Sequence, residues 1–229
     1  MNDYIAIIPI RSGSKGVKNK NIKPFYNNLS MTDITIKSAL ESNLFSSIIV
    51  TSDDESYLDK VKSYNIVTHK RPAHLGTDEA KSTDVVLDVI KSHRLDSKSW
   101  IVLLQVTSPL RSVEDIRNII AFNENSKNNE PLISFCEKQE PTCWAYKYDG
   151  SNFKRAYMEV EIENRRQDNK TYYKPNGCFY LIKIETFLKH KKFYLDTLKG
   201  YVMDRETSID VDDEFDWKIA QFLYSQSKS

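Results

Sequence analysis

The chain has 229 residues, of which 40% are hydrophobic and 28% charged, and its formal net charge is +1. This length suits one well-buried α/β domain with a small lobe attached and is short for two independent domains. The near-zero net charge gives no general reason to expect nucleic acid binding, and no apolar run approaches the ~20 residues that a membrane span needs. We therefore expect a soluble globular protein that binds neither nucleic acid nor membrane.

The cysteines and the N-terminal segment both indicate a cytoplasmic protein. Cys136, Cys143 and Cys178 are odd in number and lack C-x-x-C spacing, so they predict neither a disulfide framework nor a zinc site. Residues 1–9 show no basic region, long apolar region or small-residue cleavage site of the kind that a secretory signal carries. A reducing cytosol fits both observations.

Short apolar runs alternate with helical patterns along most of the chain. Continuous apolar runs typical of strands buried on both faces lie at 5–8, 47–51, 100–104 and 131–135. Apolar residues recur at helical spacing in 33–44, 83–93 and 113–122. The alternation predicts an α/β fold with a parallel sheet, helices on both of its faces, and ligands beyond the carboxyl ends of the strands.

The stretch 138–174 breaks this rhythm, because it mixes aromatic and charged residues around a turn signal at Asp149-Gly150. After it, residues 177–182 have the pattern of a returning strand. The final segment predicts a closing amphipathic helix from the spacing of Phe215, Ile219, Phe222 and Leu223. We expect residues 1–229 to form a single domain, with 138–174 as a projecting lobe within it.

Charge is distributed unevenly along the chain. No Asp or Glu lies between Tyr4 and Thr32, and this window holds the closely spaced cations Arg11, Lys15, Lys18, Lys20 and Lys23. The segment 204–216 carries seven acidic residues against the single cation Arg205. The first patch predicts an anionic ligand and the second a cation.

The first predicted strand leads directly into the loop Arg11-Ser-Gly-Ser-Lys-Gly16. Small residues let backbone N–H groups approach phosphate oxygens, and Arg and Lys add charge-assisted contacts. The spacing matches neither the GxxxxGK[ST] loop of ATPases nor the GxGxxG dinucleotide fingerprint. A solvated basic turn is the alternative, and the absence of acidic residues nearby favours a phosphate site.

Asp210 and Asp212 flank Val211, so an extended backbone would place both carboxylates on the same side. Two carboxylates on one face suit Mg²⁺, which takes few protein ligands and completes its shell with water and phosphate oxygens. Val211 and Ile209 would bury the opposite face, whereas the alternative is a solvated acidic loop. We predict a magnesium site at Asp210 and Asp212. We expect the acidic residues that follow to cap the last helix, namely Asp213, Glu214 and Asp216.

The loop after the first strand resembles the opening motif of the cytidylyltransferases that activate sialic acids and related sugars. Further segments resemble motifs of that family in the family's order, at 70–75 with 78–82, 103–111, 175–177 and 208–212. The resemblance implies a Rossmann-like three-layer nucleotidyltransferase fold with a mostly parallel sheet. It also implies transfer of CMP from CTP to the anomeric hydroxyl of an acidic nine-carbon sugar, an N-acylneuraminate. It also implies Mg²⁺ and a homodimer, with 138–174 as the dimerisation lobe.

The resemblance implies a role for each matched residue. Those matched to the nucleotide site are Arg11, Ser12, Gly13, Lys20, Asn21, Arg71 and Ser82. Those matched to the sugar site are Gln105, Thr107, Ser108, Arg166, Tyr180, Phe193 and Tyr194, with Arg166 reaching the neighbouring subunit's sugar. Arg11, Lys20, Asp210 and Asp212 would act in catalysis, and Asp210 and Asp212 would bind the metal.

Structural alternatives stay open for several of these residues. Arg71 has the alternative of a surface strand end, and Ser82 that of a helix cap. Thr107 and Ser108 fit equally a turn that caps the next helix, and the aromatic residues of the sugar site fit a plain core. Arg165 is an alternative to Arg166 as the sugar ligand.

The identity of the sugar also stays open. Thr142-Cys143 stands where some members place a lysine near the sugar, so neuraminic and legionaminic acids are both candidates. Rival interpretations are an enzyme for pseudaminic acid or an eight-carbon sugar, and a non-catalytic nucleotide or RNA binding protein. The basic loop lacks the interleaved aromatic residues that single-stranded nucleic acid usually stacks on, which argues against RNA.

Overall fold

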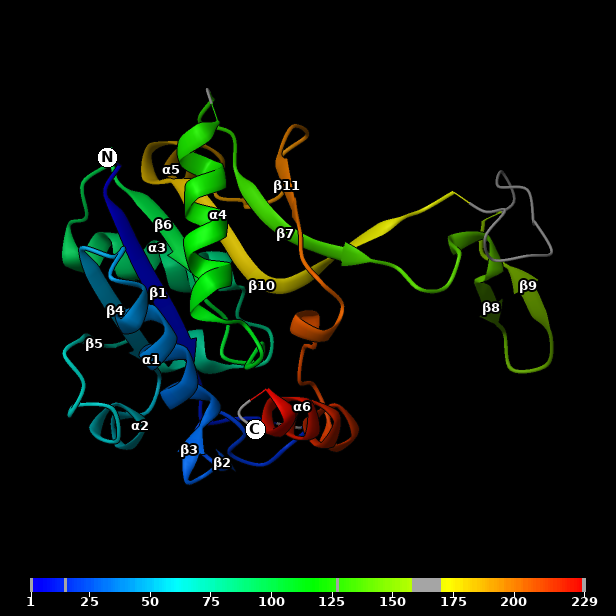
Figure 1. Ribbon diagram of the computed structural model, residues 1–229, viewed down its shortest axis with the longest axis horizontal. Helices are drawn as coiled ribbons and strands as arrows, with labels where there is room; N and C mark the ends of the chain where they lie inside the picture. The colour runs from blue at the N-terminus through cyan, green and yellow to red at the C-terminus, as the bar shows by residue number, and fades with distance from the viewer. Residues whose placement is uncertain (1, 15, 127, 158–169, 228–229) are drawn as a thin grey trace.

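The structure is a computed structural model that describes residues 2–14, 16–126, 128–157 and 170–227. Figure 1 shows a central sheet covered by helices and a lobe that projects away from it. The sheet has the strand order β11-β7-β10-β6-β1-β4-β5. Its strands are β1 (Tyr4–Ile10), β4 (Ser47–Ser52), β5 (Val67–Lys70), β6 (Trp100–Leu103), β7 (Leu132–Glu137), β10 (Tyr173–Lys183) and β11 (Lys199–Val202).

The helices are α1 (Met31–Ser42), α2 (Glu55–Asp59), α3 (Ser82–His93), α4 (Val113–Asn125), α5 (Ile184–His190) and α6 (Glu214–Gln226). Two small hairpins pair β2 (Pro24–Tyr26) with β3 (Leu29–Ser30), and β8 (Tyr146–Tyr148) with β9 (Phe153–Arg155). The predicted strands and helices are therefore present, with ends shifted by a few residues. The strands β5 and β11 and the helices α2 and α5 were not among the predicted elements.

Strand direction follows the α/β prediction except at one strand. β1 runs parallel to β4 and β6, β4 to β5, and β7 to β11. β10 runs antiparallel to both of its neighbours, β6 and β7. The sheet is thus mostly parallel, and the returning strand after the lobe enters it in the opposite sense.

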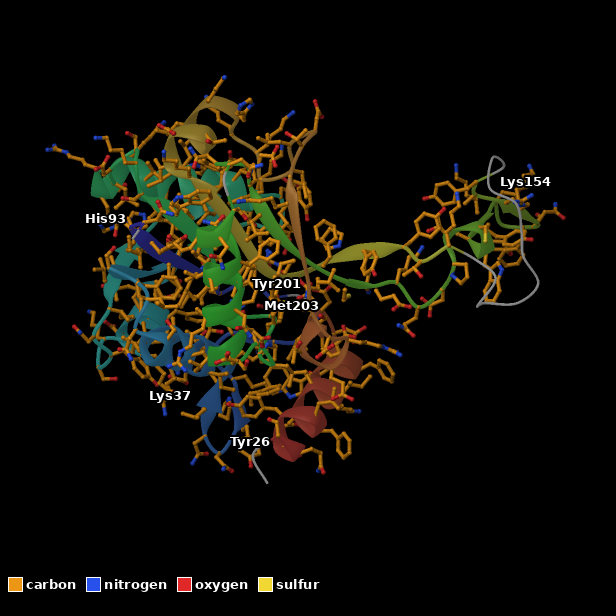
Figure 2. The ribbon with its side chains drawn as sticks, turned by 45° about the horizontal axis from the view of Figure 1, so that its top comes forward. Tyr26, Lys37, His93, Lys154, Tyr201 and Met203 are labelled. Carbon is orange, nitrogen blue, oxygen red and sulfur yellow. The ribbon has the colours of Figure 1, made fainter. Side chains whose placement is uncertain are left out.

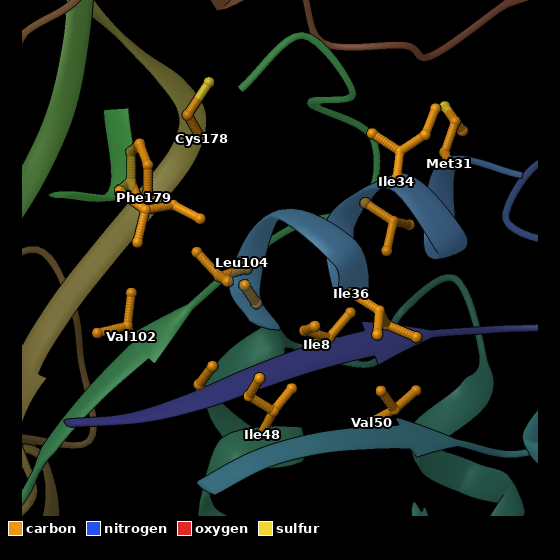
Figure 3. Close-up of a cluster of buried hydrophobic side chains, with 14 of the residues drawn as sticks. Ile8, Met31, Ile34, Ile36, Ile48, Val50, Val102, Leu104, Cys178 and Phe179 are labelled. Atoms are coloured by element: carbon orange, nitrogen blue, oxygen red, sulfur yellow. The ribbon is translucent and has the colours of Figure 1, made fainter. Parts of the chain in front are cut away.

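The core has two parts because successive side chains of a buried strand point to opposite faces. Ile8 packs with residues of α1 and α4 on one face, and Ile7 packs with Val86 and Ile90 of α3 on the other. Figure 3 shows Ile8 beside Ile36 of α1, within the first of these clusters. Full burial of a side chain of this size contributes about 1.5–3 kcal/mol, so the continuous apolar runs stabilise both layers at once.

The closing helix α6 forms as predicted, but its buried face is not the predicted one. Phe215 and Phe222 are 69% and 63% exposed, whereas Trp217 and Ala220 are buried. Trp217 packs edge-to-face on Phe25, with ring centroids 5.0 Å apart. Spacing alone had placed the phenylalanines inward, and the contact with the β2 segment turns the helix instead. The acidic cap is confirmed, since Asp213 is the N-cap residue.

The 138–174 lobe is carried by the outer ends of β7 and β10, which pair with each other where Glu137 lies opposite Tyr173. Its β8–β9 hairpin lies well away from the sheet in Figure 1, and Figure 2 shows Lys154 near the far end. Tyr148 and Phe153 stack on each other at 4.7 Å, and both are exposed. Arg165 and Arg166 lie outside the described residues. No helix in the described part of the chain is both long and apolar enough to cross a bilayer.

Candidate active site

A cavity of about 280 Å³ lies at the carboxyl ends of β1, β5 and β6. This is the edge at which a parallel sheet presents ligands. Residues matched to the nucleotide, sugar and metal sites meet in its walls, namely Arg11, Lys20, Asn21, Arg71, Ser82, Gln105, Thr107, Asp210 and Asp212. The fold therefore brings together residues that are spread over most of the sequence.

Arg71 is buried at the wall of this cavity, where it holds several backbone segments together through hydrogen bonds. Only 3% of it is exposed, and its guanidinium donates to the carbonyls of Ile10, Thr51 and Leu75. Burial lowers the pKa of Arg71, and the nearby Asp53 carboxylate partly offsets this. The alternative of a surface strand end is therefore wrong. Arg71 fixes the ends of β1 and β4 relative to each other while still lining the cavity.

Asn21 is similarly engaged with the backbone. Its side-chain amide donates to the backbone carbonyl of Arg11 at 3.0 Å, and the backbone carbonyl of Asn21 accepts from the Thr32 hydroxyl at 2.6 Å. These bonds join the loop after β1 to the start of α1. Because Asn21 is 4% exposed and still lines the cavity, its position is fixed by the fold rather than by a ligand.

The loop that follows β1 has two different sides. Arg11 faces the cavity and pairs with Asp78 at 2.6 Å, with both side chains about one-third exposed. Ser12 turns the other way, where its hydroxyl donates to Asp53 at 2.9 Å. Gly13 is exposed, and nothing lies within 4 Å of where its Cβ would stand. Of these three, only Arg11 lines the cavity.

The basic loop and the acidic segment are in direct contact. Lys20 is 8% exposed, and its Nζ donates to the carbonyl of Val211 at 2.7 Å and lies 3.6 Å from the Asp212 carboxylate. A Cβ on Gly16 would overlap the carbonyl oxygen of Asp212 and lie 3.1 Å from its carbonyl carbon. Glycine is therefore required at position 16 for the two segments to meet.

Asp210 and Asp212 both face the cavity, and the residue between them is buried as predicted. The Val211 N–H donates to the carbonyl of Thr107 at 2.8 Å, which holds the segment extended beside the end of β6. Burial raises the pKa of Asp210, and the negative charge of Asp212 raises it further, while a hydrogen bond from Thr107 lowers it. Asp210 and Asp212 are both exposed, and Asp210 has its exposure toward the cavity while protein packs around its other sides.

This donor set fits Mg²⁺. Two carboxylates facing one cavity leave most of the coordination shell for water and phosphate oxygens, which is the arrangement that magnesium prefers. In the part of the chain that the structure describes, no cluster of three or more His, Cys, Asp or Glu side chains could hold a metal ion.

A second cavity, of about 480 Å³, adjoins the first and shares Ser82 and Gln105 with it. Tyr180, Phe193 and Tyr194 form its aromatic side. The Tyr180 and Phe193 rings lie 5.4 Å apart, and the two tyrosine hydroxyls are 3.4 Å apart. Burial raises the pKa of Tyr180. Tyr180 and Phe193 are buried and Tyr194 is exposed, so a plain core does not account for all three, and their role toward a sugar stays a prediction.

The helix-cap alternatives are wrong. Lys81 is the N-cap residue of α3, so Ser82 is its first residue and faces both cavities. The N-cap residue of α4 is Ser112, which lies beyond Thr107 and Ser108. Ser108 is fully buried, whereas Thr107 lines the first cavity.

Sequence reasoning missed three residues that shape the site. Asp53 holds Ser12 and lies 3.4 Å from Arg71, and Asp78 lines the cavity and pairs with Arg11. Arg111 is buried, donates to the carbonyls of Gln105 and Cys178, and burial lowers its pKa to about 10. Asp78 and Arg111 stand within the matched motifs, so the sequence could have indicated that they belong to the site, but it did not indicate what they contact.

The three-layer arrangement is that of the α/β nucleotidyltransferases. The solved structure of CMP:2-keto-3-deoxy-manno-octonic acid synthetase complexed with CTP matches 98% of this chain and 99% of that chain with a TM-score of 0.72. Sequence identity is 14%, so this likeness concerns the fold alone. Residues 5–229 match the family model described as cytidylyltransferase, and the chain belongs to that family.

Two relatives illustrate the range of proteins that this chain is similar to. It is 30% identical to the N-acylneuraminate cytidylyltransferase of Escherichia coli, over 94% of this chain and 51% of that protein. It is also 30% identical to the CMP-N,N'-diacetyllegionaminic acid synthase of Campylobacter jejuni, over 98% of this chain and 96% of that protein. The chain therefore spans about half the length of the first relative and nearly all of the second.

Proposed function

We propose that this protein transfers CMP from CTP to the anomeric hydroxyl of an acidic nine-carbon sugar, an N-acylneuraminate or legionaminate, and releases pyrophosphate. The observation that carries the proposal is the pair of adjoining cavities. One holds cations and carboxylates suited to a nucleoside triphosphate, and the other has an aromatic side suited to an N-acyl group. Ser82 and Gln105 stand where the two ligands would meet. The names of the relatives support this pairing of substrates.

The chemistry would consist mostly of positioning and charge neutralisation, as in other phosphoryl-group transfers. Arg11 and Lys20 would hold the triphosphate, so that their charges offset the charge that grows on the departing pyrophosphate. Arg11 is paired with Asp78. A partly exposed ion pair of this kind is worth about 0–1 kcal/mol, so phosphate oxygens can replace the carboxylate at little cost.

We propose further that Asp210 and Asp212 hold Mg²⁺. When bound, the ion supplies positive charge at the phosphate oxygens that develop charge during the transfer. Lys20 lies 3.6 Å from Asp212 and would limit repulsion between the carboxylates before the metal arrives.

The protein is proposed to act as a cytoplasmic homodimer. The described cysteines are free and buried, which suits a reducing compartment. The 138–174 lobe exposes Tyr146, Tyr148 and Phe153 between 50% and 69%, a concentration of apolar surface that a second copy would cover. Arg166 would then reach the partner's sugar, as its matched position in the family implies.

The test is pyrophosphate release by the purified full chain with Mg²⁺, CTP or UTP, and a panel of neuraminic, legionaminic, pseudaminic and eight-carbon acidic sugars. We expect CTP to be strongly preferred, because a site built for the amino group of cytosine leaves buried groups unpaired with uracil. Equal rates with both nucleotides would leave only a general nucleotidyltransferase. The sugar with the highest kcat/KM identifies the acceptor, and no release with any sugar would refute the proposal.

Asp212→Ala and Asp213→Ala form a matched pair for the metal role. Asp212 faces the cavity, and its loss should abolish turnover or raise the magnesium requirement steeply. Asp213 caps α6, so its loss should reduce stability by about 1 kcal/mol while turnover changes little. Parental activity of Asp212→Ala at low magnesium would show that the metal assignment is wrong.

A further inference from the structure

Strand β10 carries an irregularity next to the proposed metal ligands. Its register against β7 shifts between Pro175 and Tyr180, and Gly177 has a φ of +78° in the left-handed region. A Cβ on Gly177 would lie 3.4 Å from the Asp210 carboxylate and 3.7 Å from the Ser108 hydroxyl. The bulge therefore brings the backbone of β10 close beneath Asp210, where glycine suits both the φ and the limited space.

Asn176, the residue before this glycine, uses its whole side-chain amide inside the protein. It is 4% exposed, and its Oδ1 accepts from the Ser134 hydroxyl at 2.5 Å and from the Cys178 N–H at 3.2 Å. Its Nδ2 donates to the Ser208 hydroxyl at 2.8 Å and contacts the Met203 sulfur at 3.4 Å. One amide thus joins β7, the bulge of β10 and the chain that follows β11.

The bond to Ser208 reaches the acidic segment. Ser208 lies two residues before Asp210, and its hydroxyl also donates to the carbonyl of Asp204 at 2.6 Å. Asn176 therefore holds the turn from which the acidic segment starts, as well as the bulge on which Asp210 rests. It lies outside the walls of both cavities and touches no predicted substrate position.

We infer that Asn176 is a positioning residue that sets the Asp210 carboxylate in its place relative to Asp212. It acts through the Gly177 bulge from one side and through Ser208 from the other. Only a side chain with both an acceptor and a donor on one planar group can make these bonds together, which is why an amide suits the position. The inference rests on the proposed magnesium role of the two aspartates.

Asn123 provides a matched control, because it is an equally buried amide at the other end of the sheet. It is 3% exposed, donates to the hydroxyl of Tyr4 at 2.9 Å and accepts from Lys199 at 2.9 Å. Tyr4 begins β1, whereas the candidate site lies where β1 ends. Asn123→Ala therefore removes a buried amide of helix α4, at the opposite end of the sheet, without disturbing the acidic segment.

The experiment is a titration of the CTP-loaded full chain with Mn²⁺, read by electron paramagnetic resonance, with a protein-free CTP sample as the reference. Mn²⁺ serves as the probe because it takes the same oxygen ligands as Mg²⁺. Asn176→Ala should bind Mn²⁺ about ten- to a hundredfold more weakly than the parent, the usual effect of losing a group that orients a metal ligand. Ser208→Ala should weaken binding in the same direction, and Asn123→Ala should bind as the parent does.

Thermal unfolding of the same variants separates positioning from plain structural support. If Asn176→Ala and Asn123→Ala both lower the Tm but both keep the parental Mn²⁺ affinity, Asn176 is only structural and the inference is overturned. If Asn176→Ala does not fold, Ser208→Ala decides, and parental affinity in that variant overturns the inference. A parent that binds no Mn²⁺ beyond the CTP reference would instead remove the metal assignment itself, and the inference with it.

Discussion

Replacing Gly16 with Ala tests the contact between the basic loop and the acidic segment. The added Cβ would overlap the carbonyl oxygen of Asp212 and stand 3.1 Å from its carbonyl carbon and 3.3 Å from the Cα of Asp213. All three neighbours are backbone atoms, so no side chain can rotate away. The loop and the acidic segment must therefore separate.

The size of the effect follows from that separation. Restoring ordinary van der Waals contact needs a shift on the order of 1 Å, and a misplacement of this size in an active site costs about 10²-fold in rate. This corresponds to about 2.7 kcal/mol of transition-state stabilisation. Because Lys20 bonds to the carbonyl of Val211 and Asp212 faces the cavity, the shift moves a proposed phosphate ligand and a proposed metal ligand apart.

The assay is pyrophosphate release with one substrate varied while the other is saturating, so that kcat/KM is measured for CTP and for the sugar. Gly13→Ala is the matched control in the same loop, since nothing lies within 4 Å of its added Cβ, and it should keep most of the parental activity. Equal losses in both variants would point to the flexibility of the loop rather than to the contact. Parental kcat/KM in a folded Gly16→Ala protein would refute the reasoning.

Three further predictions concern other parts of the molecule. Burial lowers the pKa of His93 below its ordinary 6.5, so the unfolded chain binds more protons below that pH and stability falls as pH drops. His93→Gln should lose less stability than the parent between about pH 7.5 and about pH 5.5 in urea unfolding, and an equal loss would contradict this. Tyr180→Phe removes the hydroxyl that lies 3.4 Å from that of Tyr194, so the KM for the sugar should rise while the KM for CTP stays constant. The expected rise is about three- to tenfold, the worth of one hydrogen bond, and a change confined to CTP would place the sugar elsewhere. Arg166→Ala and Asp212→Ala chains should each be nearly inactive, and their verified heterodimer should recover one working site; no recovery would end the shared-site proposal.

Much of the fold could be predicted from the sequence because its strands are buried on both faces. Runs such as 5–8 and 100–104 have no polar interruption, and only a strand in the middle of a three-layer structure tolerates that. The pattern of apolar residues does not depend on strand direction, so the antiparallel direction of β10 could not be predicted from it. The exposed edge strand β5 and the short strand β11 carry too few buried residues to show a pattern.

The helix α6 was predicted correctly, but its buried face was not. Periodicity shows that a segment has an apolar stripe, but both Phe215 and Trp217 are apolar, and only tertiary packing decides which of them faces inward. The contact of Trp217 with Phe25 settles the orientation, and it joins residues that are far apart in the sequence.

The candidate site could be predicted where the chemistry of the side chains agreed with the order of the family motifs along the chain. The carboxylates flanking Val211 meet Arg11 and Lys20 in one cavity, as expected. What the sequence could not show is which polar groups serve the ligand and which serve the fold. Ser12 and Arg71 stand in two different motifs, both matched to the nucleotide site, yet Ser12 bonds to Asp53 and Arg71 is held by backbone carbonyls.

The attachment of the 138–174 lobe has a consequence for how relatives of this protein can diverge. The chain leaves the sheet at Glu137 and returns at Tyr173, and these two residues are already paired across β7 and β10. An insert anchored by adjacent paired strands can change length without altering the register of the sheet. Doubling such a loop adds only about 0.6 kcal/mol of closure entropy. The part of the molecule proposed to meet the partner can therefore evolve quickly, while the sheet that carries the acidic segment stays constant.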